Sequence, residues 1–399
     1  MKRFITFLSA LLLAGSAAWT QDFSFDLHGF VNPHFYADSR SIVGGKEDMM
    51  HFYPKPIQHD SLGNDINDGW KANMLAITAR LGLRINGPEM LGAKTSAYIE
   101  GDFTGATAAT INSLRLRHAY TNFDWERHSL LVGQYWYAMV VHEIMPMTNP
   151  LNMGAPFHCY ARHPQVRYSY RNRGWELLAV AHWQLDNTSQ GLLDGVVQNS
   201  SLFARHSMIP ELNAQARFRT SRLFVGLAAN LKTIQPIVNT KGTALGRQLH
   251  HSPSFSLFGS YRFDGYTVKA QTLLNNSLYE GSSLGGYVIL SDTLRNSHSF
   301  YDWHFNTVWA DIERNHGHWR PGLFLGFARN MDDQAHADDP TRTILGRGHD
   351  LSYLWRIQPR LTYTTLKGLS FIGEAEYTCA GYETPAYNLR LSLSILYDF

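Results

Sequence analysis

Apolar and polar residues alternate along the carboxyl-terminal stretch of the chain, residues 387–399. Every second position is apolar or aromatic: Tyr387, Leu389, Leu391, Leu393, Ile395, Tyr397 and Phe399. The positions between them are polar, with Leu396 as the exception. A period of two predicts a β-strand with one apolar and one polar face. The length of this stretch and its aromatic end are typical of a transmembrane β-strand, which needs about 9–11 tilted residues.

The same alternation predicts about sixteen strands in the whole chain, a count open by about two because three of them alternate poorly. The predicted strands are residues 23–36, 74–86, 91–103, 111–123, 129–137, 164–170, 175–184, 211–220, 222–231, 254–263, 266–274, 301–312, 319–328, 351–363, 369–379 and 387–399. Short turns such as Asp264-Gly265, a strong hairpin signal, alternate with connections that are mostly long and polar.

The alternating turn lengths predict an all-β fold, a transmembrane antiparallel β-barrel with short periplasmic turns and long extracellular loops. A barrel of this size encloses an aqueous channel. A soluble β-sandwich is the alternative fold for alternating strands. The long terminal strand and the loop pattern favour the barrel.

The amino-terminal residues 1–21 have the pattern of a secretory signal peptide. Lys2 and Arg3 precede an apolar run over residues 4–14, and small residues follow at 15–18. No later stretch approaches the roughly 18 consecutive apolar residues of a transmembrane helix. We therefore predict that residues 22–399 form a single barrel domain in the outer membrane of a Gram-negative bacterium.

Composition narrows the possible functions. The formal charge is only +2, so a nucleic-acid partner is not expected. The aromatic content of 13% suits the interface girdles of a membrane barrel. The two cysteines, Cys159 and Cys379, are too few for a disulfide framework, and two separate thiols are favoured over one bridge.

Zinc-protease and phosphate-binding motifs are absent from the sequence. No H-E-x-x-H and no phosphate-binding glycine loop occurs, and we predict that the protein is not an enzyme and has no cofactor. Three histidine pairs have no diagnostic spacing, and no metal site is expected at them. The pairs are His158 with His163, His250 with His251, and His316 with His318.

The polar strand faces are expected to line the lumen. The basic candidates for pore lining and selectivity are Arg80, Arg84, Lys94, Arg115, Arg117, Arg167, Arg217, Arg219, Arg262, Lys269, Arg356, Arg360 and Arg390. The acidic candidates are fewer: Glu100 and Asp102, together with Asp26, Glu176, Asp302, Glu374 and Glu376. An arginine-rich lumen favours anions. The alternative is that these arginines pair with the glutamates and brace the barrel; the two roles are compatible, and the surplus would set selectivity.

The connection 138–163 is the candidate constriction loop. It contains four methionines and several prolines and is too apolar for full solvation. It is expected to fold into the pore or to cover a neighbouring subunit, and a packed extracellular cap is the alternative.

Two neighbouring stretches resemble a known family. Residues 115–120 read R-x-R-H-A-Y, and residues 131–136 read L-x-G-Q-x-W after a short turn. This pair of motifs resembles the DcaP-like trimeric outer-membrane porin family. The resemblance implies a homotrimer of sixteen-stranded barrels that admits small, preferably anionic, organic solutes. It also implies that Arg115 and Arg117 face the lumen and that Gln134 and Trp136 are wall residues below the constriction.

The terminal strand resembles the last strand of bacterial outer-membrane barrels, whose final aromatic residue is read by the barrel assembly machinery. Tyr397 and Phe399 are therefore the expected assembly signal. The remaining expected partners are outer-membrane lipids and small anionic or neutral solutes. Some members of the resembled family carry an amino-terminal coiled-coil extension, but here the first predicted strand follows the signal almost directly, so no periplasmic stalk is expected.

Passive diffusion of small hydrophilic solutes through a porin, with anion preference, is the predicted function. Two other functions remain open. One is a substrate-specific channel for an anion such as phosphate or a dicarboxylate. The other is a non-conducting structural or adhesion barrel whose long loops are the working surface.

Overall fold

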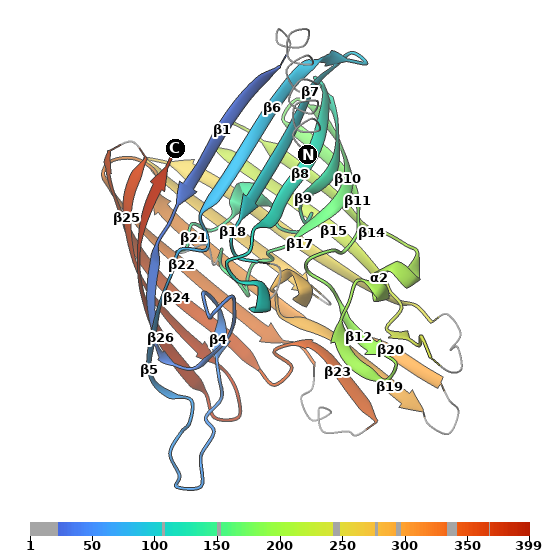
Figure 1. Cartoon of the computed structure of the whole chain (residues 1–399), viewed down its shortest axis with the longest axis vertical. Helices are drawn as coiled ribbons and strands as arrows, with labels where there is room; N and C mark the ends of the chain where they lie inside the picture. Colours follow the sequence, from blue (N-terminus) through green and yellow to red (C-terminus); the bar gives the residue numbers. More distant parts are fainter. Residues whose placement is uncertain are drawn as a thin grey trace, which may run out of the picture.

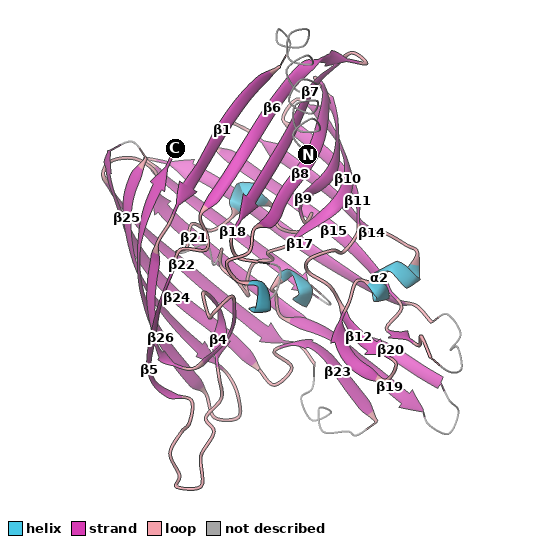
Figure 2. Ribbon diagram, viewed as in Figure 1, coloured by secondary structure: helices cyan, strands magenta, loops and turns pink. Residues whose placement is uncertain are grey.

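The computed structural model describes residues 23–105, 108–149, 153–241, 248–275, 278–292, 297–332, 341–366 and 368–399. The predicted signal peptide, residues 1–21, lies outside the described residues. Strands dominate the fold, and the few helical segments lie in connections between strands (Figure 2). Within the described residues, no helix is long and apolar enough to cross a membrane.

One antiparallel sheet closes on itself as a barrel (Figure 1). Eighteen segments belong to this sheet, and two wall strands are each interrupted once, so the barrel has sixteen strands. The interrupted strands are β1 (Ser24–Val31) with β2 (His34–Arg40) and β5 (Asp68–Leu75) with β6 (Arg80–Met90). The other fourteen are β7 (Ala93–Asp102), β8 (Arg115–Trp125), β9 (His128–Trp136), β10 (Arg162–Asn172), β11 (Trp175–His182), β14 (Glu211–Arg219), β15 (Leu223–Ile234), β17 (His250–Phe263), β18 (Tyr266–Asn275), β21 (Phe305–Arg314), β22 (Trp319–Asn330), β24 (Tyr353–Leu366), β25 (Leu369–Ala380) and β26 (Ala386–Asp398).

These strands confirm the predicted barrel and its strand number, while several boundaries differ. The first two wall strands extend further toward the loop end than predicted, to Arg40 and back to Asp68. Pro33 lies at the break between β1 and β2, where its missing N–H cannot join the ladder. The predicted strand 111–123 begins only at Arg115, and the predicted strand 301–312 is split at His304.

Long connections lie at one end of the barrel and short turns at the other. The long connections contain small sheets and helical turns, several of which extend beyond the barrel wall (Figure 1). These elements are β3 (Ile42–Gly45), β4 (Met50–Pro54), β12 (Gln190–Leu193), β13 (Val196–Asn199), β16 (Ile237–Val238), β19 (Gly285–Asp292), β20 (Ser297–Trp303), β23 (Arg342–Arg347), α2 (Leu202–Ser207) and the 3-10 turns η1 (Ala108–Thr110), η2 (His142–Ile144) and η3 (Tyr279–Gly281). The turns at the other end include Asp264-Gly265, which was predicted as a hairpin.

The strand faces follow the predicted alternation. In β26, Leu391 and Leu393 are exposed on the outside, whereas Arg390 and Ser392 are buried on the inside. The adjoining β25 has the same arrangement, with Glu376 buried between exposed or half-buried apolar neighbours. The barrel therefore has an apolar outer surface and a polar interior, as a membrane barrel with an internal channel requires.

The terminal strand closes the barrel. β26 pairs with β25 on one side and with β1 and β2 on the other, the latter from Phe30↔Asp398 to Asp38↔Arg390. Phe399 exchanges two backbone hydrogen bonds with Gly29, at 2.9 and 3.0 Å. Because an open strand edge is not tolerated in hydrocarbon, these pairings are the ones on which membrane insertion depends.

Deletion of Phe399 is expected to reduce barrel assembly while leaving the conductance of each assembled channel unchanged. The deletion removes the backbone partners of Gly29 at the seam but no inward-facing charge. The folded fraction is measured from the gel mobility of heated and unheated protein, and the conductance in planar bilayers. Phe371→Ala, which removes an outward aromatic side chain from the adjoining strand, is the control. Normal assembly of the truncated chain would contradict this account of closure.

Candidate functional site

The described part of the connection between β9 and β10, residues 137–149 and 153–161, lies inside the barrel. Several of its apolar side chains are fully buried, among them Met139, Ile144 and Phe157, whereas Met147 is exposed. The buried side chains belong to one apolar cluster with inward-facing residues of the opposite wall, such as Trp309 on β21 and Phe324 on β22. The connection therefore crosses the lumen, which agrees with the first of the placements expected for residues 138–163.

Hydrogen bonds fix this connection, hereafter the lumen loop, to the far wall. Lys269 on β18 donates to the carbonyl of Met145 (3.1 Å), and Thr307 on β21 donates to the carbonyl of Phe157 (3.1 Å). On β26, the hydroxyl of Ser394 donates to the side-chain carbonyl of residue 149 (2.7 Å). Anchors on three separate wall strands hold the loop across the barrel.

The Phe157 ring of the lumen loop packs against a glycine of the barrel wall. A Cβ atom on Gly326 of β22 would meet the Phe157 ring at 2.6 Å. Only a residue without a side chain allows Phe157 to lie this close to the wall. Sequence reasoning did not find this glycine, because its requirement arises from contact with a distant loop.

The β3–β4 hairpin of the first long connection also reaches inward-facing wall residues. Arg356 on β24 donates to the carbonyls of His51 and Phe52, at 3.1 and 3.0 Å. His51 also contacts the carboxylate of Glu376 on β25. Two connections, rather than the single one expected, thus lie against the inner wall.

The motif strands β8 and β9 form a distinctive part of the wall. The ladder between β7 and β8 shifts register after Glu100, so that Arg117 and its neighbour His118 are both buried. The side-chain amide of Gln134 donates to the carbonyls of Leu116 and Arg117, both at 3.1 Å. The first motif therefore contains a β-bulge, and Gln134 of the second motif donates hydrogen bonds to two carbonyls of that bulge.

Most of the predicted basic lumen residues are paired with carboxylates. The pairs are Arg80 with Glu100 (3.6 Å), Arg115 with Asp102 (2.8 Å), Arg117 with Glu100 and Asp102 (2.5 and 2.8 Å), Arg217 with Glu143 and Glu176 (2.8 and 3.5 Å), Arg219 with Glu143 (3.8 Å), Lys269 with Glu313 (3.2 Å), Arg356 with Glu376 (3.1 Å), Arg360 with Asp311 (2.6 Å) and Arg390 with Asp38 (2.7 Å). The bracing role that the sequence left open is thus present.

The acidic side of the lumen was underestimated from the sequence. Asp38, Glu143, Asp311 and Glu313 all pair with lumen arginines or lysines, but none was a candidate. Asp38 and Glu143 lie in segments predicted as loops, and the strand that contains the other two alternates poorly. In the structure Asp38, Asp311 and Glu313 lie on wall strands, and Glu143 lies on the lumen loop.

Four of the predicted basic residues have no carboxylate partner among the described residues: Arg84, Lys94, Arg167 and Arg262. Arg84, Lys94 and Arg262 are exposed, whereas Arg167 is half-buried and donates to Gln165 (3.1 Å). Arg167 also lies over the Tyr135 ring, at 4.9 Å from its centre. Within the described residues, four of the thirteen basic candidates are therefore left without a carboxylate partner.

Two of the unpaired arginines line a lumen cavity of about 310 Å³ between the lumen loop and the short-turn end. Its charged lining consists of the four arginines Arg84, Arg167, Arg171 and Arg217 and the two glutamates Glu143 and Glu176. A larger space of about 980 Å³ shares Glu143, Arg171 and Glu176 and adds Arg127, Arg173 and Arg219 to the lining. Positive charge therefore exceeds negative charge along this part of the inner wall.

Guanidinium groups also shift the ionisation of the lumen loop. Burial by itself would raise the pKa of the Tyr160 phenol, but Arg117 and Arg162 foremost lower it to about 6. Both guanidiniums donate to the phenol oxygen, at 3.1 and 3.0 Å. Burial likewise opposes ionisation of Glu143, and Arg217 outweighs it and lowers the pKa of Glu143 to about 2. Anionic groups are thus stabilised inside this wall.

Several other predicted residues lie where the sequence placed them. Trp136 is in the wall and stacks on Arg162 and Arg117, with distances of 5.1 and 5.7 Å to its ring centre. Cys159 and Cys379 are free and buried, in agreement with two separate thiols. Asp302 differs from the prediction: it lies on β20, in a separate sheet of the long connections rather than in the barrel wall, and contacts His250 (3.0 Å).

Sixteen antiparallel strands, a polar lumen and an internal loop define the protein as a porin-type β-barrel. The particular likeness comes from solved structures. The outer membrane channel DcaP of Acinetobacter baumannii has a TM-score of 0.69 and 17% identity, with 95% of this chain and 98% of that chain covered. An anion-selective porin from Comamonas acidovorans has a TM-score of 0.56 and 12% identity over 95% of this chain and 100% of that chain.

A third similar structure is the trimer form of OmpT, an outer membrane protein of Vibrio cholerae. Its TM-score is 0.55 and its identity 8%, over 95% of this chain and 100% of that chain. No protein-family model matches the sequence, and no curated protein matches it significantly. The chain therefore has the fold of Gram-negative outer-membrane porins, and the predicted resemblance to DcaP is confirmed at the level of the fold.

Arg360→Met is expected to lower the free energy of unfolding by about 3–5 kcal/mol, the usual cost of leaving one charge of a buried pair without its partner. Arg360 forms two bonds to Asp311, at 2.6 and 3.0 Å, and both side chains are at most 3% exposed. Unfolding by urea in detergent micelles measures the change. The double variant Arg360→Met/Asp311→Leu should recover most of the loss. If the two substitutions were additive, the pair would not be the bracing contact described here.

Proposed function

We propose that this protein is an outer-membrane porin through which small hydrophilic solutes, anions in preference, diffuse passively. The fold supports the general part of this proposal, since the similar structures are outer-membrane channels and porins. The signal-peptide pattern of residues 1–21 supports export from the cytoplasm. Transport then needs no chemical step: solutes diffuse along a water-filled path, and the electrostatic barrier along this path sets which solutes pass.

One observation supports the anion preference: the cavity below the lumen loop is lined by four arginines against two glutamates. Among these, Arg84 and Arg167 lack a carboxylate partner within the described residues. An unpaired guanidinium lowers the electrostatic barrier for an anion and raises it for a cation. The lumen loop forces solutes past this wall, so we propose that residues 138–163 act as the constriction.

Homotrimeric assembly is part of the same proposal. The similar OmpT structure is a trimer form. The porin-type fold supports this assembly for the present chain, with outer-membrane lipids around the apolar surface and the barrel assembly machinery recognising Tyr397 and Phe399.

The reversal potential of the channel in a salt gradient tests the selectivity. The wild-type channel is expected to show the sign of an anion-selective pore, and Arg84→Gln/Arg167→Gln should move the reversal potential toward the cation side. The control is Arg205→Gln, an exposed arginine on α2 in a loop outside the lumen. A cation-selective wild type would contradict the proposal.

The same recordings separate the other two functions. A small conductance that is blocked by phosphate or by one dicarboxylate would indicate a substrate-specific anion channel, with the arginines of the cavity as its binding site. A complete lack of conductance in correctly folded protein would indicate a structural or adhesion barrel.

A further inference from the structure

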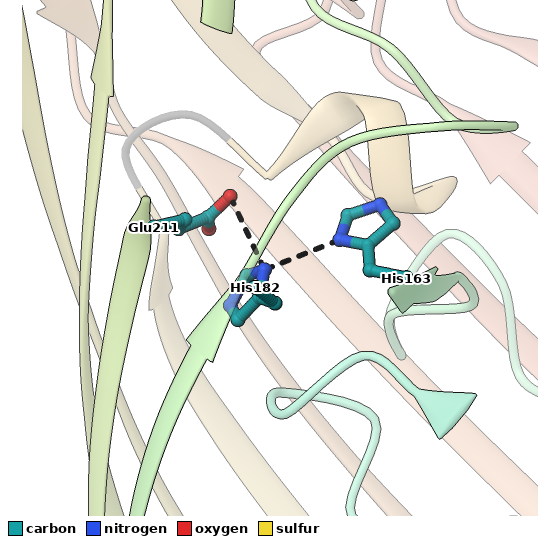
Figure 3. Close-up of side chains that lie close together, drawn as sticks. All are labelled: His163, His182 and Glu211. Atoms are coloured by element: carbon teal, nitrogen blue, oxygen red, sulfur yellow. Dashed lines mark hydrogen bonds and ion pairs between the residues drawn. The ribbon is translucent and has the colours of Figure 1, made fainter. Parts of the chain in front are cut away.

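Two histidines and a glutamate meet at the loop end of the barrel wall. His163 lies at the start of β10, His182 ends β11, and Glu211 begins β14. These strands are neighbours in the sheet, and His182 is directly opposite Glu211 in the ladder. The three side chains converge on one point inside the wall (Figure 3).

The distances suit shared coordination of one cation. The Nδ1 atoms of His163 and His182 are 3.3 Å apart, and the His182 Nδ1 atom is 3.8 Å from Oε2 of Glu211. One donor atom from each residue lies within 4.8 Å of the others. Zinc bonds of about 2.0–2.1 Å in tetrahedral geometry separate two nitrogen ligands by roughly 3.3 Å. A small rotation of Glu211 is all that is needed to bring its oxygen to the same separation.

The three side chains of this cluster are deeply buried, which is unusual for a carboxylate and two imidazoles that bind no cation. Both histidines are fully buried, and Glu211 is 5% exposed. Oε1 of Glu211 accepts from Tyr137 and Asn230, both at 2.6 Å, which turns Oε2 toward the histidines. Its Oε2 atom is buried and has no hydrogen-bond donor among the described residues. Oε2 of Glu211 is therefore a bare buried oxygen that faces two imidazole nitrogens, and a cation bound between them would satisfy it.

The buried lysine of a nearby wall strand pairs with another carboxylate and not with Glu211. Lys232, a buried cation on the wall strand β15, pairs with Glu280, at 2.8 and 3.0 Å. A hydrogen bond between the two Nδ1 atoms would satisfy only those two atoms and would leave Oε2 of Glu211 bare. A divalent cation satisfies all three donors together.

We propose that His163, His182 and Glu211 bind a divalent transition-metal ion of the zinc type, with water completing the coordination. Two imidazoles and one carboxylate are a ligand set that suits Zn²⁺. His182 and Glu211 flank the connection 183–210, so the ion closes this long loop at its base. Through Tyr137, it also braces the first residue of the lumen loop. Sequence reasoning expected no metal, because His163 was considered only with His158 and the three ligands come from three strands.

Zinc titration of the purified, chelator-treated full-length protein tests the site. Calorimetry is expected to show one tight site per chain, and zinc should raise the thermal unfolding temperature. His182→Gln and Glu211→Gln are expected to weaken binding by more than about 100-fold, beyond the 10–100-fold cost of changing an outer-shell partner. His251→Gln, an exposed histidine at the same end of the barrel, is the control and should bind as the wild type does.

Cobalt(II) provides a readout that needs no variant. In wild-type protein it should give the intense visible absorption of a four- or five-coordinate site with nitrogen ligands. Failure of the wild type to take up zinc, or equal binding by folded His182→Gln, would overturn the proposal. Should His182→Gln fail to fold, a weak absorption typical of six-coordinate aqueous cobalt in the wild type would overturn it as well. None of these readouts depends on conductance, so the result stands apart from the proposed transport function.

Discussion

Closure of the backbone ladder is the constraint on which the rest of this structure depends. In hydrocarbon, each strand needs hydrogen-bonded neighbours on both sides, and only a closed barrel provides them. β26 meets this requirement by pairing with β25 and with the interrupted first strand, where Phe399 bonds to Gly29. Once the ladder is closed, the alternation of side chains sends apolar residues to the lipid and polar residues to the lumen.

The polar lumen creates a second requirement, since buried guanidinium groups need partners. Near the loop end and across the far wall, arginines such as Arg360 and Arg390 form ion pairs with carboxylates and stabilise the packing inside the lumen. Toward the short-turn end the balance differs, and Arg84 and Arg167 face a cavity without a carboxylate of their own among the described residues. The same residue type therefore stabilises one part of the barrel and sets the field in another.

Sequence reasoning reached the fold because a period of two is a local signal that each strand carries by itself. It reached the inward-facing arginines for the same reason. It missed Asp311 and Glu143, because pairing depends on register between strands and on a loop that folds back through the lumen. It also missed the cluster of His182 and Glu211, because these residues are neighbours in the sheet but are separated by the connection 183–210 in the chain. Contacts across the lumen arise from tertiary structure and have no periodic pattern.

Single-channel recording of the wild-type protein in planar bilayers tests the central claim most directly, namely that a closed sixteen-stranded barrel leaves a water-filled path past the lumen loop. The account predicts discrete, ohmic conductance steps that grow in proportion to salt concentration. Correctly folded protein that inserts into the bilayer without any conductance steps would contradict it.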